Sequence, residues 1–184
     1  MNIVQYRPQI AIIGSRNLSK ENLQRVEDIS FSLVEEKYRI VTGGLGSLQK
    51  YAHKGAKRSS HSGDGDTIAI LPGFDPSPAI GHADIIIPTG LDILRNVIVA
   101  NCDLVICIGG GAGTLSEIAF AWQLNRPIVS VGGSGWSSKL AGETLDHRFP
   151  DSKIIDCSNS TIEEIIDTVN NLTEQFRPRH TGIS

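Results

Sequence analysis

The chain has 184 residues, of which 40% are hydrophobic and 20% charged, with a formal net charge of −3 at pH 7. This length allows one domain with a substantial core, and the composition is that of a folded rather than a disordered chain. A slight acidic excess disfavours binding to a phosphate backbone, so we expect no nucleic-acid partner. No apolar run approaches the length of about 18 residues that a transmembrane helix needs, so we expect no membrane partner.

Apolar runs alternate with helical patterns along the whole chain. Helices are predicted at about 19–36, from about 45 to 57, at 91–100, from the glycines after 108 to about 124, and at 161–175. Polar or glycine-rich segments at 59–66 and 132–136 are predicted to be loops, the second as a mobile cover for a pocket. Strands are predicted at 9–13, 39–42, 67–71, 84–87 (stopped by Pro88), 104–108, 127–131 and 153–156.

Short apolar strands separated by helices indicate a mostly parallel sheet with helices on both faces. We therefore predict a doubly wound, Rossmann-like α/β fold, with a single domain over residues 1–184 and a frayed tail from about residue 177. In such sheets ligands bind where the strands have their carboxyl ends. The glycines gather at those ends, at Gly14, Gly43, Gly44, Gly73 and in the segment 109–113.

The cysteines and the N-terminal residues indicate the cellular compartment of the protein. Cys102, Cys107 and Cys157 are odd in number and have no CxxC spacing, which argues against a disulfide framework and against zinc. Cys107 lies in an apolar run and is interpreted as a buried thiol. The first residues lack the basic and apolar regions of a signal peptide. We therefore expect a cytoplasmic protein without a metal site.

The segment from Ile108 to Glu117, IGGGAGTLSE, is the most informative part of the sequence. A helix that starts directly after a strand and several glycines presents free N–H groups and the positive end of its dipole to an anion. We therefore expect a small phosphorylated ligand. The predicted ligand-binding residues are Gly109, Gly110, Gly111, Ala112, Gly113 and Thr114, together with Gly14, Ser15, Gly43, Gly44, Pro72, Gly73 and Asn96.

The familiar glycine motifs do not fit this segment. A dinucleotide pattern G-x-G-x-x-G would need glycine or alanine where the chain has Thr114 or Ser116, and no glycine-lysine-serine/threonine ending of a P-loop occurs. Nicotinamide and P-loop chemistry are therefore disfavoured.

Arg95 and Glu117 are the candidate catalytic residues. Arg95 follows the strand at 84–87 and Glu117 follows the strand at 104–108, so both face one crevice if these strands are parallel neighbours. Arginine suits phosphate, and a carboxylate beside a phosphate suits acid–base work. Two simpler interpretations stay open: Thr114 and Glu117 have the spacing of a capping box, and Arg95 could form an ordinary surface or inter-helix ion pair.

These residues resemble the LONELY GUY or "lysine decarboxylase-like" (SLOG) superfamily, whose mark is P-G-G-x-G-T-x-x-E with an arginine upstream. The segment 109–117 matches this mark with Gly109 in place of the proline, and Arg95 takes the place of the arginine. The segments ILPGFDPS (70–77) and IPTGLDILRN (87–96) are similar to the molybdenum-cofactor carrier branch. The chain departs from the family at Gly43–Gln49, which stands for G-G-x-x-x-G-[ILV]-M but is one residue shorter and lacks the methionine.

The resemblance implies a protein that binds a nucleotide-like or pterin ligand, requires no cofactor, and holds molybdenum cofactor or a nucleotide as its bound group. It also implies a homo-oligomer, either a dimer or a tetramer. Two alternatives stay open: a phosphoribohydrolase that cleaves the N-glycosidic bond of a nucleoside 5′-monophosphate through Arg95 and Glu117, and a sensor of a nucleotide signal. Lysine decarboxylation is rejected, because no lysine stands at a comparable strand end to hold pyridoxal phosphate.

Overall fold

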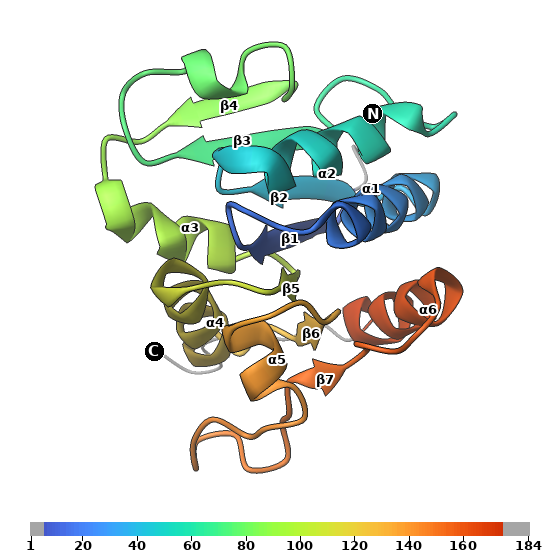
Figure 1. The fold of residues 1–184 in the computed structure, drawn as a ribbon, viewed down its shortest axis with the longest axis vertical. Coiled ribbons are helices and arrows are strands. Elements are labelled where there is room, and N and C mark those ends of the chain that lie inside the picture. Colours follow the sequence, from blue (N-terminus) through green and yellow to red (C-terminus); the bar gives the residue numbers. More distant parts are fainter. Residues whose placement is uncertain (1–5, 175–184) are drawn as a thin grey trace.

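A computed structural model describes residues 6–174, which form a seven-stranded parallel sheet in the order β4-β3-β2-β1-β5-β6-β7 (Figure 1). The predicted fold class is thereby confirmed. The strands are β1 (Gln9–Gly14), β2 (Arg39–Thr42), β3 (Thr67–Leu71), β4 (Ile85–Pro88), β5 (Leu104–Ile108), β6 (Ile128–Ser130) and β7 (Ile155–Asp156).

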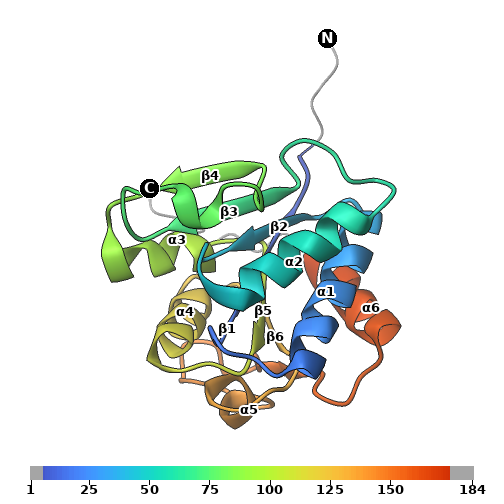
Figure 2. The ribbon, with the colours of Figure 1, turned by 45° about the horizontal axis from the view of Figure 1, so that its top comes forward.

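Helices cover both faces of the sheet. One layer holds α1 (Lys20–Glu35), α2 (Gly46–Arg58) and α6 (Ile162–Thr173), and Figure 2 shows α1 and α2 side by side in it. The other layer holds α3 (Asn96–Ala100), α4 (Ala112–Gln123) and the short α5 (Trp136–Leu140). Two turns of 3₁₀ helix, η1 (Ser77–Ala79) and η2 (Asp92–Arg95), complete the described elements.

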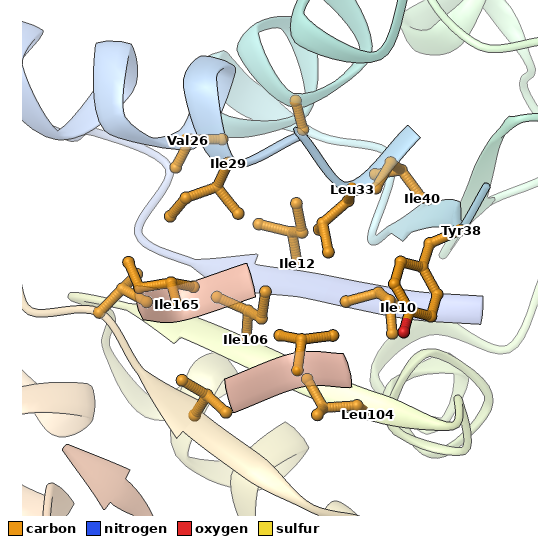
Figure 3. Packing of buried hydrophobic residues seen from close by; sticks show 14 of the residues in the cluster. Ile10, Ile12, Val26, Ile29, Leu33, Tyr38, Ile40, Leu104, Ile106 and Ile165 are labelled. Carbon is orange, nitrogen blue, oxygen red and sulfur yellow. The ribbon is translucent and has the colours of Figure 1, made fainter. Parts of the chain in front are cut away.

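The buried side chains explain why the strands are apolar throughout. Successive residues of a strand point to opposite faces, and both faces are covered here, so neither set can be polar. In β1, Ile10 and Ile12 pack under α1 beside Leu104 and Ile106 of β5 (Figure 3), whereas Ile13 packs on the side of α3 and α4.

The chain reverses its direction of travel across the sheet between β1 and β5. From β1 it builds outward through β2 and β3 to the edge strand β4, and then returns to place β5 on the other side of β1. Helices on either side of such a switch point leave a crevice at the carboxyl ends of its strands. The sheet order therefore puts a crevice above β1 and β5.

Three predicted elements were wrong in detail. Pro88 does not stop the fourth strand but lies in it and pairs with Leu71, which an edge strand tolerates because the missing N–H faces outward. The helix predicted at 91–100 is divided into η2, whose first residue Asp92 has a φ of 50°, and α3. The loop predicted around Trp136 contains α5. Gln175 and the tail from residue 177 lie outside the described residues.

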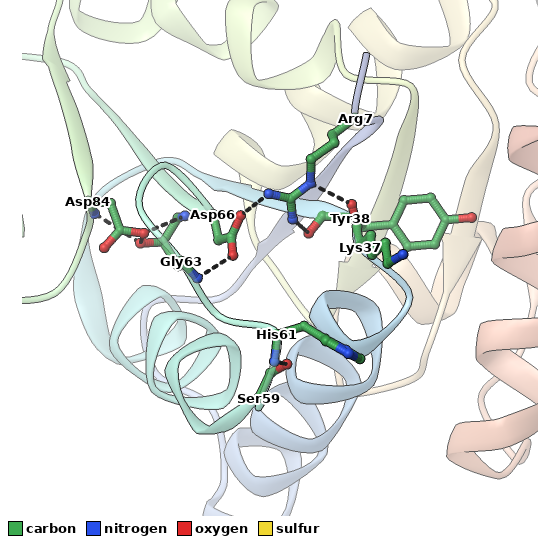
Figure 4. A network of polar contacts seen from close by, with 9 residues as sticks. Arg7, Lys37, Tyr38, Ser59, His61, Gly63, Asp66 and Asp84 are labelled. Carbon is green, nitrogen blue, oxygen red and sulfur yellow. Dashed lines mark hydrogen bonds and ion pairs between the residues drawn. The ribbon is translucent and has the colours of Figure 1, made fainter. Parts of the chain in front are cut away.

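At the amino ends of the strands, a polar network fixes the segment before β1 (Figure 4). The Arg7 guanidinium donates hydrogen bonds to the buried Asp66 carboxylate and, over 3.0 Å, to the carbonyl of Lys37. The other oxygen of Asp66 accepts the N–H of Gly63 at 2.8 Å. The loop before β3 is thus tied to the start of the sheet, at the end opposite the predicted ligand site.

Candidate functional site

The N-terminus of α4 presents unpaired backbone donors. Its N-cap residue is Gly111, which supplies no capping side chain, and the N–H groups of Ala112, Gly113 and Thr114 donate no hydrogen bond within residues 6–174. Gly110 makes this turn with a φ of +104°, and a Cβ there would lie 2.3 Å from the hydroxyl oxygen of Thr114. Unpaired donors and the helix dipole together form a site for an anion.

A pocket of about 370 Å³ opens at this helix end and runs along the carboxyl ends of β1, β2 and β3. Its volume is within the range of roughly 300–1,000 Å³ that small-molecule sites occupy. The sequence-predicted residues that line it are Gly14, Ser15, Gly43, Pro72, Arg95, Asn96, Gly111, Gly113, Thr114 and Glu117.

Five predicted ligand contacts do not line the pocket. Gly109 and Gly110 are instead joined to α5, because their carbonyls accept the N–H groups of Ser137 and Trp136 at 3.2 and 3.0 Å. The segment around Trp136, which was predicted to cover the pocket, is thus hydrogen-bonded to Gly109 and Gly110. The other three are Gly44, Gly73 and Ala112.

Arg95 and Glu117 form an ion pair in the pocket wall. The Nη1 atom of Arg95 donates a hydrogen bond to Oε1 of Glu117 at 2.7 Å. The Arg95 side chain is only 12% exposed and the Glu117 side chain 9%. Gly43 makes room for the guanidinium, since a Cβ at that position would lie 2.6 Å from Arg95 Nη2. The pair lies over the end of β2 and joins η2 to α4, so it is the inter-helix ion pair that the sequence left open, and it is buried rather than on the surface.

Arg95 and Glu117 meet although the condition set for their meeting, that their strands are parallel neighbours, is not fulfilled. Their strands, β4 and β5, are not neighbours, since β3, β2 and β1 lie between them. The contact arises because η2 and α3 lead the chain back from the sheet edge to α4, which α3 packs against. An amide hydrogen bond of 2.7 Å from Asn96 to the Ser116 hydroxyl joins the two helices beside the ion pair.

The capping-box interpretation of Thr114 and Glu117 is also wrong. Thr114 lies within α4 rather than at its N-cap, which is Gly111, and the Glu117 side chain is bound to Arg95. The helix starts earlier than the capping spacing implied, because the glycines alone turn the chain into it.

Burial governs the charge state of this pair. Desolvation raises the pKa of the Glu117 carboxyl above its ordinary value, and the Arg95 guanidinium opposes that rise without cancelling it. The Nε–H group of Arg95 is also buried, and it has no hydrogen-bond partner among the described residues. Glu117 therefore keeps its proton to a higher pH than an exposed glutamate does, beside an Arg95 whose Nε has no partner among the described residues.

The pocket contains three polar side chains that the sequence analysis did not select, Arg16, Gln49 and Asp92, the last at the start of η2. Arg16 follows β1, and no hydrogen bond or ion pair engages its guanidinium within residues 6–174. Gln49 lies in the first turns of α2 and is buried. Arg16 comes directly after the predicted pair Gly14-Ser15, a signal that was available; nothing in the pattern distinguished Gln49 from a surface residue.

The sequence model of the SLOG cluster4 family matches residues 7–166. The chain belongs to this family. A relative of this SLOG cluster4 protein, an uncharacterized protein of Archaeoglobus fulgidus, is 34% identical to it over 124 residues, which is 67% of this chain and 79% of the relative.

Two solved structures have the same fold as this SLOG cluster4 protein. The molybdenum cofactor binding protein of Rippkaea orientalis has a TM-score of 0.74 and 26% identity, over 91% of this chain and 98% of its own. The molybdenum cofactor carrier protein of Chlamydomonas reinhardtii has a TM-score of 0.74 and 24% identity, over 93% and 100%. The resemblance to the SLOG superfamily and its carrier branch is thus confirmed.

Within residues 6–174, no helix has the length and apolar character to cross a membrane.

Proposed function

We propose that this SLOG cluster4 protein binds a small phosphorylated ligand with a nucleotide-like or pterin ring, in the manner of a molybdenum-cofactor carrier. The observation that carries the proposal is the row of unpaired N–H groups at the start of α4, of which Gly113 and Thr114 line the pocket that also holds the unpaired Arg16 guanidinium and Ala112 lies just outside it. Three backbone donors at a helix N-terminus with a nearby cation suit a terminal phosphate.

The same residues fit the phosphate of molybdenum cofactor. None of the three cysteines lines the pocket, and all are buried elsewhere, so no thiolate of this chain would meet the metal. The chain would hold such a group through its phosphate and its ring. No cofactor is needed for this role, in which the bound group is the cargo.

Calorimetry with ribose 5-phosphate, the common nucleoside 5′-monophosphates and molybdopterin tests the proposal. We expect at least one of them to bind, and an Arg16→Gln variant to bind it about tenfold more weakly, because one charge-assisted hydrogen bond to phosphate is lost. Lys37→Gln is the matched control: it removes the same charge from an exposed side chain at the amino ends of the strands. The proposal fails if no phosphorylated compound binds, or if the Arg16→Gln and Lys37→Gln variants lose affinity by the same factor.

A second function is favoured by one observation, the buried pair of Arg95 and Glu117 inside the pocket. A carboxyl group with a raised pKa can protonate a leaving base, and Arg95 can orient the sugar phosphate. The reaction would be hydrolysis of the N-glycosidic bond of a nucleoside 5′-monophosphate, giving free base and ribose 5-phosphate. Chromatography of the released base tests for it.

We also propose that the protein forms a homodimer through the edge strand β4. Exposed apolar side chains follow one another along β4, η2 and α3, and this edge face comprises Ile85, Ile87, Leu91, Ile93, Leu94, Val97 and Ile98. An unpaired strand edge flanked by apolar side chains is self-complementary in a twofold dimer. Ile93, 73% exposed, also lines the ligand pocket, so a second copy on this face would cover the pocket mouth.

Light scattering tests the dimer. We expect a mass of two chains for the protein and of one chain for an Ile93→Asp variant, because a charge at the centre of the edge face would have to be desolvated. Ile93→Val, which keeps the face apolar, should remain dimeric. A monomer in the absence of any substitution contradicts the proposal, and a mass that changes on adding ligand would favour the sensor.

A further inference from the structure

Gln49 has an unusual hydrogen-bond balance. It is 1% exposed and lines the pocket, and its Nε2 donates to the carbonyl of Pro78 at 3.0 Å. Its Oε1 is buried and has no donor among the described residues. A buried acceptor without a partner costs more free energy than a hydrogen bond gains, so native structures rarely keep one without a use.

The contact with Pro78 fixes which end of the amide is free. A carbonyl oxygen can only accept, so the group that faces Pro78 must be the NH₂. With the amide turned the other way, two oxygens would face each other across that contact. Gln49 therefore offers an oxygen, an acceptor, as its unpaired group.

The sheet order separates Gln49 from the anion site. The N-terminus of α4 follows β5, whereas Gln49 follows β2 and contacts Pro78 of η1, which follows β3. In the sheet order, the end of β2, with Gly43 and the Arg95 guanidinium over it, lies between β5 and β3. A ligand whose phosphate is held at α4 would thus extend its ring past Arg95 toward Gln49.

We propose that Gln49 selects ligands whose ring carries an N–H donor, such as an amino-substituted purine or a pterin. This inference rests on the proposed binding of a phosphorylated ligand. The ring's N–H group donates to Oε1 of Gln49 and supplies the hydrogen bond that this oxygen lacks. A site built to pair a donor discriminates strongly against an analogue without it, because its own polar group then stays unpaired.

A purely structural role would be different. In that case Gln49 only anchors η1 through Pro78, and removing its amide would loosen the whole β3 side of the pocket. All ligands, including ribose 5-phosphate, would then bind more weakly by the same factor. The selective role predicts a loss that depends on the ring.

The experiment compares matched ligands on matched variants. Adenosine and purine riboside 5′-monophosphates differ only in the amino group, and ribose 5-phosphate has no ring base; guanosine 5′-monophosphate and molybdopterin complete the calorimetry panel. Gln49→Met keeps the side-chain volume but removes the acceptor. Gln123→Met makes the same change at an exposed position at the end of α4. Thermal unfolding of each variant shows that it is folded.

We expect each N–H-bearing compound that binds to lose about 3- to 10-fold in affinity in Gln49→Met, the worth of one hydrogen bond, and none in Gln123→Met. Ribose 5-phosphate and purine riboside 5′-monophosphate should be unaffected. Unchanged binding of the N–H-bearing compounds, or an equal loss for ribose 5-phosphate, overturns the role of Gln49. Failure of every phosphorylated compound to bind the unaltered protein overturns the proposed function itself. Should Gln49→Met not fold, a preference of the unaltered protein for purine riboside over adenosine 5′-monophosphate would overturn the inference.

Discussion

A Glu117→Gln variant is expected to release base from a nucleoside 5′-monophosphate about 100- to 10,000-fold more slowly than the unaltered protein, if the protein is a phosphoribohydrolase. Glutamine has nearly the shape of glutamate and can still accept the hydrogen bond that Arg95 donates over 2.7 Å. It cannot give a proton to a leaving base. The rate of base release, measured by chromatography, therefore reports the proton transfer alone.

Binding separates this role from a carrier's use of the same residues. Because the amide keeps the contact with Arg95, calorimetry should give a similar affinity for ribose 5-phosphate in both proteins. Glu143→Gln, at an exposed position, is the control and should leave the rate unchanged. Equal rates in Glu117→Gln and the unaltered protein would remove Glu117 from the chemistry. If neither protein releases base, the Arg95–Glu117 pair serves ligand binding rather than hydrolysis.

The raised pKa of Glu117 also sets the direction of a pH effect. Burial favours the protonated carboxyl in the folded protein, so the group contributes stability below its ordinary pKa. That contribution is lost as the pH rises through the higher pKa of the folded state. A rate that needs the protonated acid falls over the same range. Glu117→Gln should lack this part of both profiles, which urea unfolding and initial rates at several pH values would measure.

The fold could be predicted from the sequence because its causes are local. A strand with both faces covered must be apolar throughout, as Ile10 to Ile13 are, and a parallel sheet then needs a crossover connection between successive strands, usually a helix. Parallel strands also share one carboxyl edge, so glycines at the ends of different strands had to meet. Gly14, Gly43 and Gly111 line one pocket for that reason.

The strand order could not be predicted in the same way, because no periodicity records it. Arg95 and Glu117 were expected to meet if their strands were neighbours, whereas the real contact depends on the path of η2 and α3 after the edge strand. Gln49 was missed for a similar reason. In the sequence it stands in a polar helix beside Lys50, and only its position over Pro78 buries it.

Gly55→Ala is expected to lower the free energy of unfolding by about 2–3 kcal/mol through overpacking. Gly55 lies in α2 where this helix packs against α1, and a Cβ there would lie 2.0 Å from the carbonyl oxygen of Glu27. The obstacle is backbone, so α1 itself must move. Helix propensity alone would favour alanine by about 1 kcal/mol, so the close contact reverses the sign.

Urea unfolding of the Gly55→Ala variant measures this loss of stability, with the Gly73→Ala variant as the control. No atom lies within 4 Å of a Cβ at Gly73, so alanine there should change neither the midpoint nor ligand binding. The same variant tests the predicted role of Gly73 as a ligand contact.

The α1–α2 contact also bears on the pocket. The Ser47 hydroxyl at the start of α2 donates to the Arg16 carbonyl at 2.8 Å, in the loop that leads into α1. If α1 and α2 move apart in Gly55→Ala, this contact is disturbed and affinity for a phosphate ligand should fall along with stability. An unchanged midpoint would mean that α1 shifts without cost, and rigid packing of the two helices could then not be what positions Arg16.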